Sequence, residues 1–127
     1  MFYEGMPNIT ILRGRLGAGM PSNMNDAERA ETRRMHDENL SRAIAMAQGG
    51  DCDLLVLDEV SDAHRMGLLD GEALFAFLRG KPVAMEIVLT GHQPIPAYLA
   101  VADYVTEMKK HKHPYEQGIF AREGVEY

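Results

Sequence analysis

The sequence lacks the features that would place it in a membrane or an oxidising compartment. Its single cysteine, Cys52, excludes an intramolecular disulfide, and one unpaired thiol is what a reducing compartment permits. No apolar run approaches the ~20 residues that span a bilayer, and no basic-then-apolar secretion signal precedes Met6. These absences predict a cytoplasmic protein with no membrane partner.

An excess of basic residues is also lacking. The chain has 13 Lys and Arg against 19 Asp and Glu, a net charge of -6. Nucleic-acid binding usually requires a basic face, so no nucleic-acid partner is predicted. The basic and titratable run Lys109–His113 is more often a solvated face than a site. It matters for function only if it points into a pocket.

The chain is predicted to form a single α/β domain over residues 1–127, because its length and 46% hydrophobic content suit one core. Asn25 and Glu28 have the spacing of a capping box, which predicts a helix from Asp26 to Gln48. Asp70 is expected to cap a second, short helix that ends at Gly80. A third helix is predicted over Ala97–Ala102, after Pro94 and Pro96.

Two continuous apolar runs, Asp53–Leu57 and Ile87–Leu89, predict central strands that are buried on both faces, as in a parallel sheet. Weaker strands are expected at 8–12 and 103–108, and a flexible segment at 13–25. Strands that alternate with helices at this spacing predict a three-layer, doubly wound sheet.

Polar residues follow both apolar runs, at the strand ends where parallel sheets bind ligands. Asp58 and Glu59 follow the first, in the form of a Walker B strand, and carboxylate oxygens suit Mg²⁺ beside a nucleotide. Thr90, Gly91 and His92 follow the second; the threonine hydroxyl and a closely approachable backbone favour a phosphate or ribose. The alternative is structural, with Asp58 capping a turn and Thr90–His92 forming a tight connection.

Other reactive side chains give weaker predictions. Cys52 is expected to be structural, and His36 and His64 to be surface residues. His111 and His113 have no nearby ligands that would make a zinc site. The phosphate-binding motif G-x-x-x-x-G-K-[ST] does not occur, and the only Gly-Lys pair, at 80–81, is followed by proline.

The order of several motifs resembles the ATP:corrinoid adenosyltransferases of the BtuR/CobO/CobA type. The motifs are Leu54-Leu55-Val56-Leu57-Asp58-Glu59, Gly67-Leu68-Leu69-Asp70, Val88-Leu89-Thr90-Gly91, Ala102-Asp103-Tyr104-Val105-Thr106-Glu107-Met108, Lys112-His113-Pro114-Tyr115, Gly118-Ile119, Ala121-Arg122 and Gly124-Val125-Glu126-Tyr127. The last four form a C-terminal tail and are the most specific part. The resemblance extends from about Gly5 to the end of the chain.

The resemblance implies a P-loop NTPase type of sheet, usually in a homodimer, that transfers the 5′-deoxyadenosyl group of ATP to a Co(I) corrinoid. It implies that Asp58 and Glu59 lie on the Mg²⁺ side of the nucleotide, with catalytic and metal-binding roles. It also implies that Thr90, Gly91 and His92 lie beside ATP. Cobalt is the nucleophile, so the protein need only position ATP and the corrinoid and neutralise the leaving triphosphate.

The sequence departs from the family pattern in three places. It begins where the family's second strand would be ending, so the first strand, the P-loop and its helix are expected to be missing. Gly17-Ala18-Gly19-Met20-Pro21 stands where aromatic residues often face the corrinoid, and His92 replaces the usual arginine. The expectation is a fragment or one subunit of a split enzyme, as a homodimer or with a P-loop-bearing partner chain. The alternatives are a non-catalytic family relative that acts as a binding or regulatory module, and an unrelated small α/β regulator.

Overall fold

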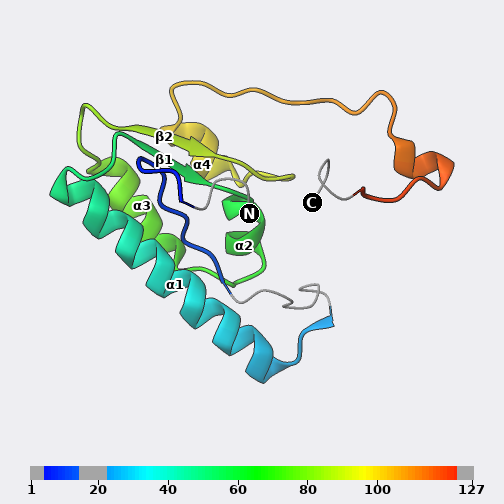
Figure 1. Ribbon diagram of the computed structural model, residues 1–127, viewed down its shortest axis with the longest axis horizontal. Helices are drawn as coiled ribbons and strands as arrows, with labels where there is room; N and C mark the ends of the chain where they lie inside the picture. Colours follow the sequence, from blue (N-terminus) through cyan, green and yellow to red (C-terminus); the bar gives the residue numbers. More distant parts are fainter. Residues whose placement is uncertain (1–4, 15–22, 123–127) are drawn as a thin grey trace.

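The computed structural model describes residues 5–14 and 23–122, and in these residues the chain forms a mixed α/β structure with a small parallel sheet (Figure 1). In chain order the elements are α1 (Asp26–Gly49), β1 (Leu54–Leu57), α2 (Val60–Arg65), α3 (Gly71–Arg79), β2 (Glu86–Leu89), α4 (Pro96–Val101) and the 3-10 helix η2 (Pro114–Gln117). Residues 15–22 of the segment expected to be flexible, and the motif at 124–127, lie outside the described residues.

Helix α1 begins and ends as its sequence predicts. The Asn25 side chain accepts the Glu28 backbone N–H at 2.9 Å, and the Asn25 backbone N–H donates to the Glu28 carboxylate at 2.8 Å, so the capping box is complete. Gly50 ends the helix in the left-handed conformation, at φ 82°. The buried residues lie mainly in the second half of the helix; they are Thr32, Leu40, Ala43 and Ala47.

The two shorter predicted helices are present, and two further helical segments were not predicted. Asp70 caps α3 by accepting the Ala73 N–H at 3.0 Å, and α4 starts at Pro96. The unpredicted segments are α2 and η2, of six and four residues. Helix α2 has no side-chain cap, so its start carried no sequence signal.

The strands β1 and β2 pair in parallel, with Leu55 opposite Ile87 and Leu57 opposite Leu89. These four side chains pack with helical residues in two adjoining core clusters. One cluster is centred on Leu40, Val60, Leu69, Leu74 and Tyr98, and the other on Ala47, Phe77 and Met85. The core therefore lies between one face of the sheet and the helices.

The opposite face of the sheet corrects the prediction that both strands are buried on both faces. Leu54, Val56 and Val88 are 56%, 53% and 44% exposed. Each strand alternates exposed and partly buried residues, because the described helices pack against the side of the sheet that holds Leu55 and Leu57. The described part of the chain thus has helices against one face of its sheet, and the three-layer arrangement is not seen in it.

The two weaker strand predictions, at 8–12 and 103–108, are wrong. Neither segment forms a strand, and nearly all of their residues are exposed. In the described residues the sheet consists of β1 and β2, so these segments have no strand beside them with which to pair. A short apolar run becomes a strand only where a neighbouring strand meets its N–H and C=O groups.

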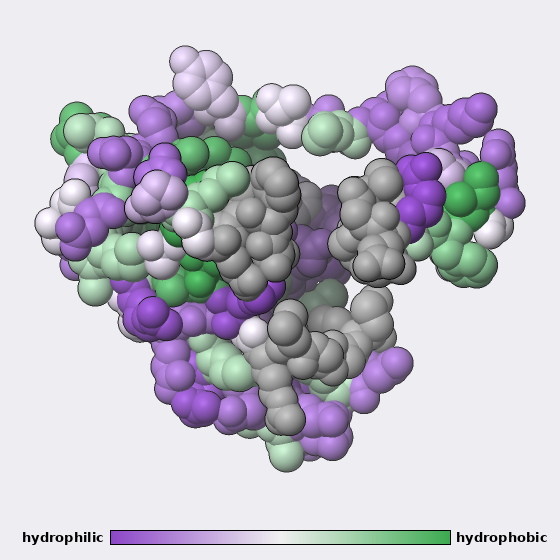
Figure 2. Space-filling view, viewed as in Figure 1, coloured by the Kyte–Doolittle hydropathy of each residue, from purple (hydrophilic) through white to green (hydrophobic). Residues whose placement is uncertain are grey.

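After α4 the chain leaves the body as an extended arm that ends near η2 (Figure 1). We call residues 102–122 the C-terminal arm; all of them are exposed. Its exposed large apolar and aromatic side chains include Tyr104, Val105, Met108, Tyr115, Ile119 and Phe120. Figure 2 shows hydrophobic surface on the arm, away from the body and among hydrophilic residues.

Candidate functional site

The polar residues that follow the two strands meet at one edge of the sheet. The Thr90 hydroxyl donates to Oδ1 of Asp58 at 2.7 Å and accepts the Glu59 backbone N–H at 2.8 Å. One hydroxyl therefore joins both acidic positions to the end of β2. We call Asp58, Glu59, Thr90, Gly91 and His92 the strand-end site.

Glu59 has a backbone conformation that is unusual for its residue type. With φ 51° and ψ 25° it is left-handed, the only such residue other than glycine in the described part of the chain. This conformation costs a non-glycine residue about 1–2 kcal/mol and is common at functional sites. It turns the chain from β1 into α2, so that both carboxylates are exposed at the end of the strand.

Gly91 is required by packing against α2. A Cβ atom at this position would lie 1.7 Å from Oγ of Ser61 and 3.0 Å from Oδ2 of Asp62, and the φ of 156° also disfavours other residues. The sequence indicated that a ligand approaches this glycine. The structure shows that Ser61 approaches it, and the approach of a ligand stays a prediction.

Asp62 belongs to this site and was missed by the sequence analysis. Its Oδ2 accepts the backbone N–H of His92 at 2.8 Å and contacts Nδ1 of the His92 ring at 3.2 Å. Its Oδ1 accepts from Arg65 at 2.9 Å. The His92 backbone hydrogen bond, followed by the Arg65 hydrogen bond, lowers the pKa of Asp62 below its ordinary value. No motif signals this residue, because its partner lies 30 positions away.

The strand-end site offers a partial donor set for a metal ion. Among the residues that the structure describes, no three His, Cys, Asp or Glu side chains are grouped to hold a metal. Mg²⁺ at nucleotide sites needs only one or two carboxylates, because phosphates and waters complete its shell. Asp58 and Glu59 fit that requirement, and they do not fit a metal site made of protein ligands alone.

The other reactive side chains lie outside the strand-end site. Cys52 donates from Sγ to the Leu54 carbonyl at 3.2 Å, and His36 Nδ1 contacts the Leu68 carbonyl at 2.9 Å. His64 is partly buried, with Nδ1 3.0 Å from the Tyr98 hydroxyl. His36 and His64 are both partly buried, so the surface prediction holds only in part.

The basic run Lys109–His113 lies on the exposed C-terminal arm. Lys110 forms an ion pair with Glu116 within that arm. None of the five residues lines the groove along β1 or the hollow on the outer face of α1. The run is therefore an exposed segment that lines neither hollow.

A groove of about 1040 Å³ runs along β1 and reaches the strand-end site. It lies between β1, α1 and the N-terminal segment 8–14, with Asp58 at its border. Its apolar lining includes Leu40, Ala43, Leu55, Leu57 and Leu69. Because β1 pairs on one side with β2 in the described residues, the groove follows the other, open side of the strand.

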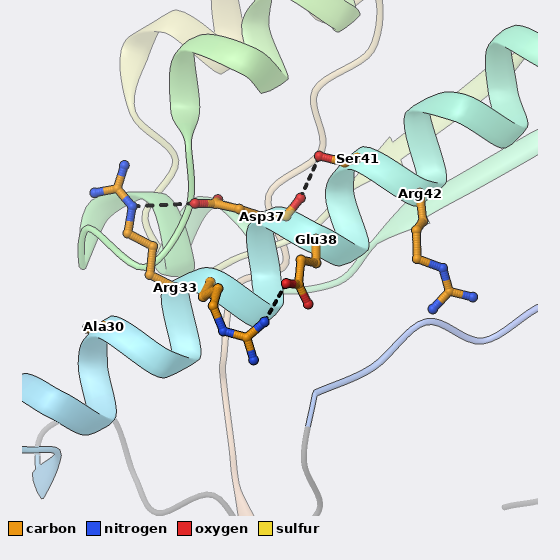
Figure 3. Close-up of a pocket in the computed structure, with 7 residues that line it drawn as sticks. Ala30, Arg33, Asp37, Glu38, Ser41 and Arg42 are labelled. Carbon is orange, nitrogen blue, oxygen red and sulfur yellow. Dashed lines mark hydrogen bonds and ion pairs between the residues drawn. The ribbon is translucent and has the colours of Figure 1, made fainter.

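A second hollow, on the outer face of α1, is a charged helix surface (Figure 3). Arg33 pairs with Asp37 at 3.5 Å, Arg34 pairs with Glu38, and the Ser41 hydroxyl donates to the Asp37 carbonyl at 2.8 Å. Arg33 and Arg34 are paired within the helix, whereas Arg42 lines the same hollow without an ion pair among the described residues, so three arginines face two carboxylates there.

No helix in the described residues is long and apolar enough to cross a membrane.

Residues 4–127 match the family model described as ATP:corrinoid adenosyltransferase BtuR/CobO/CobP. A corrinoid adenosyltransferase of Sinorhizobium sp is 34% identical over 113 residues, which cover 88% of this chain and 52% of that protein. One from Pseudomonas aeruginosa is 38% identical over 77 residues, 61% of this chain and 38% of the relative. Corrinoid adenosyltransferase CobA of Salmonella typhimurium is 29% identical over 75 residues, 59% of this chain and 38% of the relative. The chain thus spans about half, or less, of the curated relatives it matches.

Proposed function

Because the chain belongs to the ATP:corrinoid adenosyltransferase family, we propose that it contributes the metal-side half of a site that transfers the adenosyl group of ATP to a corrinoid. The observation that supports this role is the meeting of Asp58, Glu59 and Thr90 through one hydroxyl. In this proposal the end of β1 faces the triphosphate and the end of β2 lies beside the nucleotide.

The reaction is a nucleophilic displacement at C5′ of ATP. The Co(I) centre of the corrinoid substrate donates an electron pair to C5′, a Co–C bond forms, and the C5′–O bond breaks. Triphosphate leaves with the bonding electron pair. The protein supplies no nucleophile, so its residues act by positioning and by electrostatics.

Each residue of the strand-end site then has a role that follows from its chemistry. Asp58 and Glu59 would hold Mg²⁺, which when bound neutralises charge on the triphosphate. The Thr90 hydroxyl orients Asp58 and fixes the Glu59 backbone by its two hydrogen bonds. Gly91 and His92 place backbone and imidazole next to the nucleotide.

A phosphate-binding loop from outside these 127 residues is part of the proposal. The sequence contains no G-x-x-x-x-G-K-[ST] motif. We propose that a P-loop-bearing segment, in a partner chain or in a longer form of this chain, completes the three-layer sheet along the open side of β1. Asp58 is among the residues that line this groove, so a loop beside that strand would lie close to the metal side of the site.

A second candidate is a binding module of the same family without ATP chemistry. The observation that favours it is the exposure of the strand-end carboxylates, which any ligand or solvent can reach. This module would keep corrinoid or partner binding and lack adenosyl transfer.

Titration of the purified chain with MgATP, with and without a Co(I) corrinoid, separates the two. If the chain contributes the metal-side half of an adenosyltransferase site, it should bind MgATP weakly by itself, with a dissociation constant of about 1 mM or above. The reason is that the phosphate-binding loop would supply several hydrogen bonds of about 1.5–3 kcal/mol each. Glu59→Gln should remove the Mg²⁺-dependent part of that binding. Corrinoid binding with no response to Mg²⁺ or ATP would favour the module.

A further inference from the structure

Asp62 ties helix α2 to the residue that ends the strand-end site. The carboxylate is buried, and its Oδ2 receives the His92 backbone N–H at 2.8 Å and faces the His92 ring Nδ1 at 3.2 Å. Arg65 donates to the other oxygen at 2.9 Å. One buried side chain therefore fixes both the backbone and the ring of His92.

These contacts determine which ring nitrogen of His92 carries a proton. An ionised carboxylate can only accept hydrogen bonds, so Nδ1 must be protonated to bond to it. Arg65 and the His92 N–H both favour the ionised form of Asp62, whose pKa they lower. The His92 side chain is 80% exposed, so Nε2 is the ring nitrogen left for a ligand.

We propose that Asp62 is a positioning residue that holds His92 at the end of β2 so that Nε2 of the ring contacts a phosphate group bound beside Thr90. Only the identity of the ligand as a nucleotide phosphate rests on the proposed function. The fixed ring follows from the contacts of Asp62 alone. His92 itself would touch the ligand, and Asp62 would act through it.

A phosphate oxygen at Nε2 requires a proton on that nitrogen. In the doubly protonated ring both nitrogens are donors, so Nε2 can donate to a phosphate oxygen while Nδ1 donates to Asp62. The charged groups around the turn are Asp62 and Arg65 of α2, which pair with each other, and the carboxylates of Asp58 and Glu59 on the other side of Thr90.

The packing beneath the turn restricts its movement. Ser61 is 4% exposed and lies against Gly91, and its backbone N–H donates to the Thr90 carbonyl at 3.4 Å. Its Oγ has no hydrogen-bond partner among the described residues. The turn is thus held by a close contact at Gly91 and by the Asp62 carboxylate at His92.

The positioning is tested by NMR on the full chain without any ligand. Long-range nitrogen–proton spectra should show Nδ1 of His92 protonated, and the His92 amide should be protected from exchange. In Asp62→Ala the Nδ1 preference should disappear and amide exchange should be faster by about tenfold or more, as expected for the loss of a hydrogen bond to a charged group. Asp62→Asn keeps an oxygen acceptor and should retain part of the amide protection, which guards against an unfolded Ala variant.

Asp37→Ala is the matched control. The Asp37 carboxylate accepts the Asp70 backbone N–H at 2.7 Å, so this variant loses the same kind of long-range bond at a place remote in sequence from His92. Its His92 ring and amide should match the unaltered protein. A His92 ring protonated on Nε2 alone, or an Asp62→Ala spectrum like that of the control, would overturn the positioning role.

Inorganic triphosphate, added with and without Mg²⁺, tests the ligand. The Nε2 resonance of His92 should shift in a saturable way, and Asp62→Ala should weaken the apparent affinity by about tenfold. A ring held by Asp62 that does not respond to triphosphate refutes the proposal. If His92 responds equally without Mg²⁺ and in Glu59→Gln, the proposal stands and the metal role in the proposed function fails.

Discussion

Thr90 joins the two strand ends through a single hydroxyl, which gives a test at the scale of one residue. Thr90→Val keeps the shape of the side chain but leaves the Glu59 N–H and Asp58 without this partner. The free energy of unfolding should fall by about 1 kcal/mol, since water can reach the exposed groups and replace part of the loss. Urea unfolding measures this, and Thr90→Ser, which keeps the hydroxyl, is the control. Equal losses in the two variants would show that the hydroxyl is not the cause.

The lowered pKa of Asp62 makes a prediction about acid stability. A carboxyl with a folded pKa below its ordinary 3.8 contributes stability that is present above that value and is lost as pH falls through the folded pKa. The unfolding free energy should therefore decrease below about pH 4, and Asp62→Asn should show a shallower decrease over the same range. Urea unfolding at several pH values measures both curves. Parallel curves for the two proteins would remove Asp62 as a source of acid sensitivity.

At the residue scale, the sequence predicts the groups that follow strands and misses the group that holds them. Asp58 and Thr90 could be foreseen to meet, because parallel strands place their ends at one edge. The role of Asp62 could not be foreseen, because it depends on a contact with His92 that only the folded chain creates. The reason for Gly91 also changed, since its nearest neighbour is Ser61.

At the scale of the elements, ring side chains of α2, α3 and α4 contact one another. Tyr98 stacks on Phe75 with ring centroids 4.8 Å apart and meets His64 edge-on at 5.8 Å, and its hydroxyl contacts His64 Nδ1. A Cβ atom at Gly71 would lie only 2.0 Å from Nε2 of His64, so the His64 ring occupies the space beside this glycine. These three helices are therefore held together by side chains that are far apart in the sequence.

Tyr98→Phe should keep this packing and remove one hydrogen bond. We expect a loss of about 1 kcal/mol in unfolding free energy near neutral pH. Burial raises the pKa of Tyr98 from 10.0 to about 12. The neutral Tyr98 side chain therefore contributes to the free energy of unfolding below pH 10, and this contribution is lost as pH rises toward 12. The stability of Tyr98→Phe should therefore fall less steeply with alkaline pH than that of the unaltered protein. Thermal unfolding between pH 7 and pH 11 provides the measurement, and an unchanged alkaline limb would contradict it.

Local signals located the helices that have caps and breakers, and failed for elements that depend on neighbours. Asn25, Gly50 and Asp70 fixed the limits of α1 and the start of α3. Helix α2 starts at a left-handed glutamate with no cap, which no sequence rule anticipates. The segments 8–12 and 103–108 have strand-like composition, and without a neighbouring strand they stay unpaired.

At the scale of the whole molecule, the open sheet predicts association. The face that contains Leu54, Val56 and Val88 is exposed, and β1 is open on the side of the groove. Exposed apolar surface and unpaired strand edges are places where another chain binds. Light scattering should therefore show a dimer or larger species at high concentration, and charged substitution at Val56 should shift it toward monomer. A stable monomer over the whole concentration range would contradict the prediction.

The family could be predicted from the order of motifs over the whole chain, whereas the full fold could not. Motifs such as Asp58-Glu59 and Thr90-Gly91 keep their order and spacing without reference to the rest of the sheet. The face of the sheet that holds Leu54 and Val56 is exposed, and the matched relatives are about twice as long as the matched segment or longer. The predicted burial of Leu54 and Val56 on both faces of the sheet is therefore not found in the described residues.

The most direct test is a chimera in which this chain replaces the matched 113-residue region of the Sinorhizobium corrinoid adenosyltransferase. Formation of the adenosylated corrinoid from MgATP and a Co(I) corrinoid is followed by absorbance. Our account predicts that the chimera forms product and that Asp58→Asn or Glu59→Gln lowers the rate by at least about 100-fold, as for the loss of an electrostatic contact in a transition state. Cys52→Ser, outside the strand-end site, should leave the rate unchanged. A folded chimera that forms no product, or one whose rate is unaffected by both acidic substitutions, would contradict the account.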